Sequence, residues 1–121
     1  MNSPTQSGDP YAAQTGDADL LRGNVYLDSA ELLTLESFPP QYRLSLTGNL
    51  PDPCHHLRVQ VAAPDASNRI LVDVYSVADP DAMCVQMLQP FDASVPLSAS
   101  VLSAGHYTVW VNDEKIGEFD R

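Results

Sequence analysis

The chain has 121 residues, which is enough for one domain and not comfortably for two. Hydrophobic residues make up 44% of it and aromatic residues only 7%, so a core would be built mainly from Val and Leu. The net charge of −10, from 16 acidic and 6 basic residues, argues against nucleic acid or anionic lipid as a partner, because both attract cationic surfaces.

The first 22 residues are dominated by Ser, Thr, Gln, Gly, Pro and Asp. Such a segment buries too little apolar surface to offset the entropy lost on ordering. Residues 1–22 are therefore predicted to form a flexible polar tether, and residues 23–121 a folded domain. No apolar run approaches the roughly 18 residues needed to span a bilayer, and no signal peptide follows Met1. We expect the precursor to carry an export signal or lipid anchor that has been removed.

Strand signals recur at short intervals through the rest of the chain. Tyr42, Leu44 and Leu46 alternate with polar residues, and this period of two places one set of side chains on a core face. The run Ile70–Val77 is apolar at nearly every position, as expected for a strand covered on both sides. Short strands separated by turns favour an all-β antiparallel sandwich. About seven strands are predicted, at Val25–Glu36, Tyr42–Leu46, Leu57–Val61, Ile70–Val77, Ala93–Ser98, Tyr107–Val111 and Lys115–Phe119.

Two local signals modify this pattern. The alternation in the last strand breaks at Gly117, and a bulge there would restore the register. Asp79 and Pro80 are residue types that open helices, and Pro90 disfavours helical geometry in the residue before it. A short helix of about two turns is therefore predicted over Ala82–Gln89.

The two cysteines are expected to form a structural disulfide. If Leu57–Val61 and Ile70–Val77 pair as a hairpin around Asp65–Asn68, Cys54 lies beside the end of the second strand and Cys84 follows that end closely. Both would then lie at one pole of the sandwich, within reach of a bridge. An exported protein with an even number of cysteines favours the same pairing.

Catalytic chemistry and a zinc site are both poorly supported. Cys54, His55, His56 and Cys84 could be read as a zinc set, but adjacent residues on extended backbone point to opposite faces and converge poorly on one ion. A bridged cysteine also offers no thiolate nucleophile. The sequence contains no Ser-His-Asp order, nucleophile elbow or phosphate-binding glycine loop, so no catalytic residue and no cofactor is predicted.

Calcium is a weaker interpretation of the acidic residues near the same pole. Asp52, Asp79 and Asp81 could supply hard oxygen ligands, of which calcium needs six to eight. No EF-hand spacing accompanies them, and turn or cap chemistry explains each aspartate equally well. The leading prediction is that the domain holds no metal.

The region around Tyr107 resembles the tyrosine corner of immunoglobulin-like sandwiches, in which a Tyr near the start of the sixth strand bonds back to the upstream backbone. Residues 50–112 more widely resemble the immunoglobulin-like modules of bacterial exported lipoproteins. This resemblance implies an immunoglobulin-like sandwich, a non-enzymatic module and a cell-surface or other extracytoplasmic location. The chain departs from antibody-type domains because its cysteines flank one predicted hairpin. The matching pieces are Leu50-Pro51-Asp52-Pro53-Cys54, Asp81-Ala82-Met83-Cys84, Pro90-Phe91, Val95-Pro96-Leu97 and Gly105 through Asn112.

The leading functional hypothesis is a binding or spacer module of a bacterial surface protein, for a protein or surface ligand that the sequence does not identify. The alternative is a secreted proteinase inhibitor that presents a disulfide-braced loop around residues 79–91. In either case Met83, Met87 and Leu88 are candidate partner contacts. A purely structural reading of Met87 and Leu88 is that they cap the open end of the core, because methionine fills irregular gaps.

Overall fold

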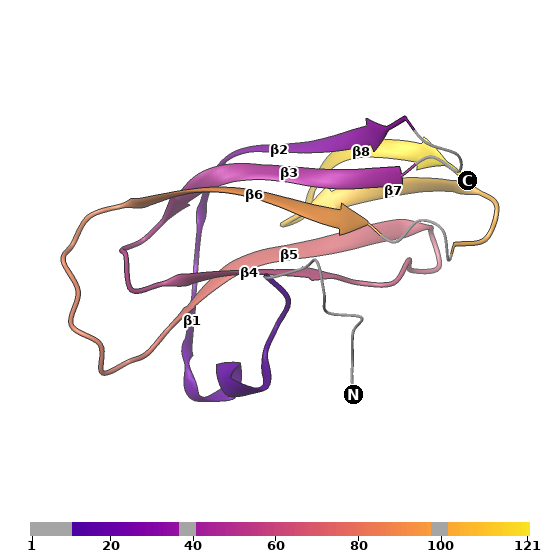
Figure 1. Ribbon diagram of the computed structural model, residues 1–121. Helices are drawn as coiled ribbons and strands as arrows, with labels where there is room; N and C mark the ends of the chain where they lie inside the picture. Colours follow the sequence, from indigo (N-terminus) through magenta and orange to yellow (C-terminus); the bar gives the residue numbers. More distant parts are fainter. Residues whose placement is uncertain (1–10, 37–40, 98–101) are drawn as a thin grey trace.

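The computed structural model describes residues 11–36, 41–97 and 102–121 and shows two β-sheets packed face to face (Figure 1). The three-stranded sheet has the order β2 (Tyr26–Leu35), β3 (Gln41–Leu50) and β6 (Gln89–Leu97). The five-stranded sheet contains β1 (Leu21–Gly23), β4 (His56–Val61), β5 (Arg69–Ala78), β7 (His106–Val111) and β8 (Glu114–Asp120). The predicted all-β sandwich is confirmed, with eight strands in the described residues where about seven were expected. Ser98, the expected end of one strand, lies outside the described residues.

Inward-facing Val and Leu side chains form the core between the sheets. Leu44, Leu46, Val59, Val95 and Val109 are each at most 1% exposed. The burial patterns of β3 and β7 confirm the predicted alternation of buried and more exposed residues. Burying one such side chain stabilises the fold by about 1.5–3 kcal/mol, so this layer is the main favourable term in folding.

Strand β5 is the centre of the five-stranded sheet because it is paired along both edges. On one edge, β4 pairs antiparallel with it from Val77 to Val72, which confirms the predicted hairpin. On the opposite edge, β7 pairs with residues 69–72 and β1 with residues 76–78. The β5–β7 pairing is parallel, which corrects the expectation of a wholly antiparallel sandwich. The chain reaches β7 through β6 of the other sheet, so no tight turn fixes its direction relative to β5.

Asn112 fills the interval between β7 and β1 on that edge of β5. Its backbone N–H donates to the Val72 carbonyl at 3.0 Å. Its side-chain oxygen accepts from the Val74 N–H at 2.8 Å, and its side-chain nitrogen donates to the Val74 carbonyl at 3.1 Å. Asn112 and Asp113 have φ values of 48° and 72°, the left-handed geometry that suits a two-residue hairpin turn and that Asn and Asp tolerate. The Asn112 side-chain amide thus makes the two hydrogen bonds to Val74 that the backbone of a neighbouring strand residue would otherwise make.

Replacing Asn112 with Ala is expected to lower the free energy of unfolding by about 2–3 kcal/mol, because two partly buried backbone groups of Val74 lose their partners. Urea denaturation of the purified domain measures this change. Asp113→Gly is the matched control, because it alters the other left-handed residue of the same turn, and it is expected to shift the value by about 0.5 kcal/mol or less. Equal effects of the two substitutions would contradict the bridging role of the Asn112 side chain.

A bulge in β8 lies where the two sheets come close at one side of the sandwich. The register with β7 shifts between Val109 and Trp110 and leaves Ile116 as the extra residue, so the predicted bulge is confirmed one residue before Gly117. A β-carbon on Gly117 would lie 3.1 Å from the Leu32 side chain of β2. The glycine therefore permits the close approach between β8 and β2.

The segment before β2 lies against the five-stranded sheet, which corrects the predicted tether over residues 11–22. We call residues 11–23 the strap; residues 1–10 lie outside the described residues. Asp17 forms a two-point ion pair with Arg58, with oxygen–nitrogen distances of 2.9 and 3.2 Å. Arg58 is only 8% exposed. The strap contains few apolar residues, but this ion pair between residues 41 positions apart in the sequence holds it on the sheet.

Further contacts fasten the strap at both ends. At its start, the Val59 N–H donates to the Tyr11 carbonyl at 2.8 Å. At its end, the Arg22 guanidinium lies 4.0 Å from the centre of the Tyr75 ring and 2.6 Å from an Asp73 carboxylate oxygen. The strap contains a short 3-10 helix, Thr15–Asp19. Among the described residues, no helix is long and apolar enough to cross a membrane.

The Asp17–Arg58 pair is expected to make stability depend on pH. The hydrogen bond from Arg58, followed by that from the Gln14 backbone, holds the pKa of Asp17 below its ordinary value of 3.8. A carboxyl whose pKa is lowered by folding stabilises the fold above its ordinary pKa, and the contribution is lost as the pH falls through the folded-state pKa.

We therefore expect the stability difference between the wild-type domain and Asp17→Asn to be full at pH 7 and to shrink as the pH falls below 3.8. Thermal melting of both proteins between pH 2 and 7 measures it. Comparing the two proteins separates Asp17 from Asp52, whose pKa is lowered by the hydrogen bond from His55. A difference that stays constant across this range would show that Asp17 does not titrate with folding.

Candidate functional site

Two connections between the sheets meet at one end of the sandwich. Residues 51–55 carry the chain from β3 of the three-stranded sheet to β4 of the five-stranded sheet, and residues 79–88 carry it back from β5 to β6. We call this end the bridged pole and residues 79–88 the bridged loop. In Figure 1 the bridged loop extends beyond the ends of the strands, at the left of the view.

The bridged loop is irregular, so the helix predicted over Ala82–Gln89 is wrong. The Ala82 N–H donates to the Asp79 carbonyl at 3.1 Å, and the Asp81 N–H donates to the Asp79 side chain at 2.9 Å. Asp79 and Pro80 therefore make a single tight turn, in which the aspartate caps its own backbone. Gln89 and Pro90 already belong to β6, where they pair with the end of β3.

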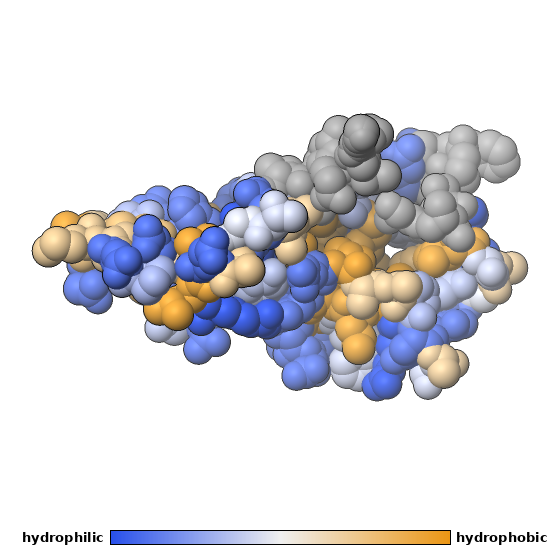
Figure 2. Space-filling view, turned by 90° about the horizontal axis from the view of Figure 1, so that it is seen from below, coloured by the Kyte–Doolittle hydropathy of each residue, from blue (hydrophilic) through white to orange (hydrophobic). Residues whose placement is uncertain are grey.

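Four apolar side chains of the bridged loop face solvent. Met83 is 97% exposed, Val85 63%, Met87 60% and Leu88 53%. In Figure 2, the left-hand end of the molecule, which the bridged loop occupies in Figure 1, shows apolar side chains at the surface among hydrophilic ones. Met87 and Leu88 therefore do not cap the core. The three predicted contact residues are all exposed on this loop, and so is Val85, whose place between cysteine and glutamine gave no signal in the sequence.

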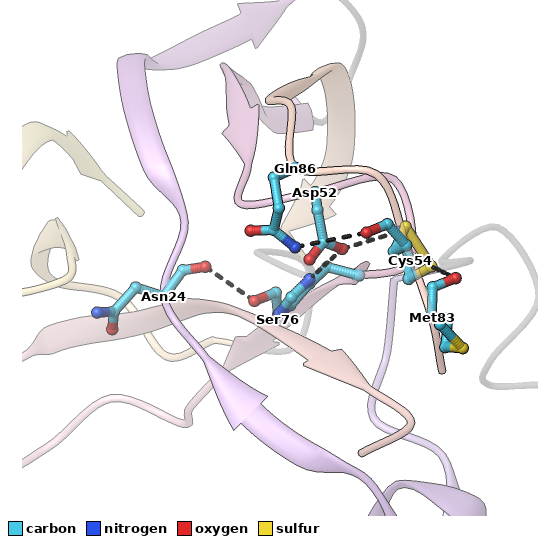
Figure 3. A network of polar contacts seen from close by, with 8 residues as sticks. Asn24, Asp52, Cys54, Ser76, Met83 and Gln86 are labelled. Atoms are coloured by element: carbon cyan, nitrogen blue, oxygen red, sulfur yellow. Dashed lines mark hydrogen bonds and ion pairs between the residues drawn. A yellow bond between two sulfur atoms is a disulfide. The ribbon is translucent and has the colours of Figure 1, made fainter. Parts of the chain in front are cut away.

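The bridge between Cys54 and Cys84 joins the two connections, as the sequence predicted (Figure 3). The two α-carbons lie 6.0 Å apart, and the bridge closes a separation of 30 residues. Cys54 Sγ also contacts the Met83 carbonyl at 3.8 Å; a bridged sulfur carries no hydrogen, so this is a packing contact. The bridge thus fixes the loop backbone immediately beside its most exposed side chain.

Asp52 orders the turn that carries Cys54. Its carboxylate accepts hydrogen bonds from the Cys54 N–H at 2.9 Å and from His55 Nδ1 at 2.8 Å. The His55 bond is the main cause of the lowered pKa of Asp52, so the carboxylate stays charged at neutral pH. Both side chains are largely buried. The aspartate therefore positions one half of the bridge.

The three aspartates considered for calcium have separate roles. Asp52 binds the turn before β4, whereas Asp79 accepts the Asp81 N–H within the bridged loop. Among the described residues, one group of three potential metal ligands lies close together, and it consists of Asp52, Cys54 and Cys84. Both cysteines of this group are used in the disulfide bridge. The structure does not bring the carboxylates of Asp52, Asp79 and Asp81 together as a ligand set.

An Asp–His–Ser arrangement also lies at this pole, but its serine is not presented to a substrate. A β-carbon on Gly23 would meet Ser76 Oγ at 3.1 Å and His55 Nε2 at 3.4 Å, so both groups lie beside that glycine. Ser76 is fully buried, and its hydroxyl donates to the Asn24 carbonyl at 2.8 Å (Figure 3). A nucleophilic serine needs an accessible oxygen that donates to its base, so this geometry does not support acyl transfer.

Tyr107 makes the backward hydrogen bond that the sequence predicted for it. Its hydroxyl, at the start of β7, donates to the Ser103 carbonyl at 2.8 Å. Its ring stacks on Phe119 with 5.6 Å between ring centres. The backbones of Gly105 and Arg121 exchange two hydrogen bonds beside it. Tyr107 therefore has a structural role in closing the β7–β8 end of the sheet.

The fold and the bridged pole define a disulfide-stapled β-sandwich module, and comparison with known proteins agrees with the β-sandwich fold. Residues 44–120 match the family described as the ORF11 beta-sandwich domain, and the chain belongs to this family. The match begins within β3 and includes the bridged pole, whereas the strap precedes it.

Three relatives come from Herpetosiphon aurantiacus. The chain is 32% identical over 89 residues to the uncharacterized 10.2 kDa protein in the HgiCIIM 5′ region, which covers 74% of this chain and 93% of that protein. It is 37% identical over 79 residues to the corresponding proteins in the HgiBIM and HgiEIM 5′ regions, covering 64% of this chain and 92% of each. No solved structure matches the chain.

Removing the bridge with Cys54→Ala and Cys84→Ala together is expected to lower the free energy of unfolding by about 3–4 kcal/mol, from the entropy of closing a loop of this length. Urea denaturation of the double variant and of the oxidised wild type measures the loss. Wild-type protein denatured in the presence of a reductant is the control and should match the double variant. A loss of less than about 1 kcal/mol would show that the two connections meet without help from the bridge.

Proposed function

We propose that this domain is a non-enzymatic binding module that works outside the cytoplasm, and that the bridged loop is its contact surface. The observation that carries the proposal is the exposure of four apolar side chains on a loop fixed by a disulfide. Soluble domains rarely gather exposed apolar side chains in one place without a partner to cover them. A braced loop also loses less conformational entropy when it binds than a free loop does.

The composition of the bridged loop suits recognition better than packing. Met83 and Met87 are unbranched and polarizable, so they adapt to the shape of an opposing surface. Burial of apolar surface is worth about 25 cal/mol per Å², so covering four such side chains supplies a useful driving force for association.

The bridge supports an extracytoplasmic location, because disulfides persist in oxidising compartments and are rare where thiols are kept reduced. The resemblance to immunoglobulin-like modules of exported lipoproteins supports the same location and a lipid anchor in the precursor. Alkylation with N-ethylmaleimide before and after reduction, on fractionated cells that make the protein, tests the location. Protected sulfurs in an extracytoplasmic fraction are expected, and two free thiols in the cytosol would contradict it.

Proteinase inhibition is the second candidate, favoured by the almost complete exposure of Met83 directly before the bridged Cys84. Inhibitory loops gain from the same kind of brace, because the backbone is held ready for the proteinase. A panel of serine, cysteine and metallo-proteinases assayed with added domain separates the two functions. Stoichiometric inhibition that is lost in Met83→Asp would favour the inhibitor, and unchanged rates throughout would leave the binding module.

The binding function predicts that the double substitution Met83→Ser and Met87→Ser weakens binding of the domain to its source cells. The labelled domain is added to a strain of these cells that lacks the gene, and flow cytometry measures how much is retained. Retention should fall about tenfold or more, because each lost contact contributes about 1 kcal/mol. Leu71→Ser is the matched control, because Leu71 is an apolar side chain of β5 that is 41% exposed away from the bridged loop. Circular dichroism and melting temperature should be unchanged in both variants. Equal retention of all three proteins would contradict the contact surface.

A further inference from the structure

We infer that the partner of the bridged loop is a different protein whose surface offers an apolar cleft bordered by Lys and Arg side chains. This inference rests on the proposed function and specifies its partner. It follows from the charge around the loop, the shape of the loop and the apolar surface at its base.

The bridged loop lies in the most one-sided stretch of charge in the chain. From residue 70 to residue 105 there is no Lys, Arg or His, while four aspartates occur, at positions 73, 79, 81 and 92. Asp79 and Asp81 lie at the start of the loop, and both are exposed. The nearest arginine across the sheet pairing is Arg22, opposite Val77, and its charge is already matched by Asp73 at 2.6 Å. The rim of the apolar surface is therefore negative.

This charge selects among the possible occupants. A second copy of the chain also carries a net charge of −10 and would bring its own Asp79 and Asp81 against the same residues, which opposes self-association. A membrane with anionic lipids repels the same rim. A surface with Lys and Arg around an apolar centre complements both the charge and the hydrophobic side chains, and such complementarity speeds encounter and fixes orientation.

The shape of the loop points to a cleft as its receptor. The loop extends beyond the strand ends (Figure 1), and the bridge holds its backbone at Cys84. The Met87 N–H donates to the Val85 carbonyl at 3.1 Å, which makes a further local turn after the bridge. At the base of the loop Leu21, which is 61% exposed, pairs with Ala78, the last residue of β5. Leu21 thus adds a further exposed apolar side chain beside the start of the loop.

Site-specific photo-crosslinking in the cells that make the protein tests the partner directly. The photoreactive residue p-benzoylphenylalanine replaces Met83 in one full-length chain and Leu71 in the control chain. Position 83 is expected to give an adduct with one other protein, joined at a peptide whose neighbourhood contains apolar side chains together with Lys or Arg. Position 71 is expected not to give this adduct.

The purified pair then shows whether charge and apolar contact both contribute. Met83→Ser with Met87→Ser should weaken binding about tenfold or more, and Asp79→Asn with Asp81→Asn about threefold, an effect that disappears in high salt. Calorimetry at low and high salt measures both.

Three results would overturn the inference and are distinguishable from one another. An adduct of position 83 with a second copy or with lipid would remove the inferred partner but keep the loop as a contact surface. An affinity that changes neither with salt concentration nor with the aspartate substitutions would contradict the Lys and Arg side chains inferred around the partner's cleft. No adduct at position 83, or the same adducts at 83 and 71, would remove the proposed contact surface itself.

Discussion

The Cys54–Cys84 bridge is the constraint on which the proposed function depends, because it joins two of the connections by which the chain changes sheets. The sandwich needs the chain to pass from β3 to β4 and from β5 to β6, and both passages lie at the bridged pole. Asp52 fixes the first passage by accepting hydrogen bonds from Cys54 and His55. The bridge transfers that order to the second passage, which would otherwise be a loop of exposed apolar residues without a fixed backbone. The disulfide brace and the exposed apolar side chains thus occur in the same segment.

The regular parts of the fold could be predicted from the sequence because they follow from local periodicity. Alternation in β3 and β7 gave the buried face correctly, since a strand places every second side chain on one side. The β4–β5 hairpin followed from two such runs around a turn, and the bridge followed from the hairpin, because pairing places both cysteines at one end. The bulge near Gly117 was visible as a break in the same alternation.

The parts that could not be predicted depend on contacts between distant residues. Asp79 and Pro80 have the same preferences at the start of a helix and in a tight turn, and the bridge at Cys84 ties the backbone that follows this turn to the connection before β4. The strap has the composition of a tether, and the contacts that hold it on the sheet, such as the ion pair of Asp17 with Arg58, join residues far apart in the sequence. An asparagine in a turn is common, so the sequence gives no sign that the Asn112 side chain bonds to the backbone of β5. That role depends on the edge of β5 lying next to this turn in the folded chain. In each case a tertiary contact overrides or completes a local preference.

The most direct test of the account is the backbone mobility of the bridged loop with and without its disulfide, measured by ¹⁵N relaxation. With the bridge intact, residues 83–85 should have order parameters of about 0.8, near those of the strands, and reduction should lower them to below about 0.6 while the strands stay unchanged. Such a result would show that the bridge turns an exposed apolar segment into a preformed surface. Equal order in the oxidised and reduced protein, whether high or low, would contradict it.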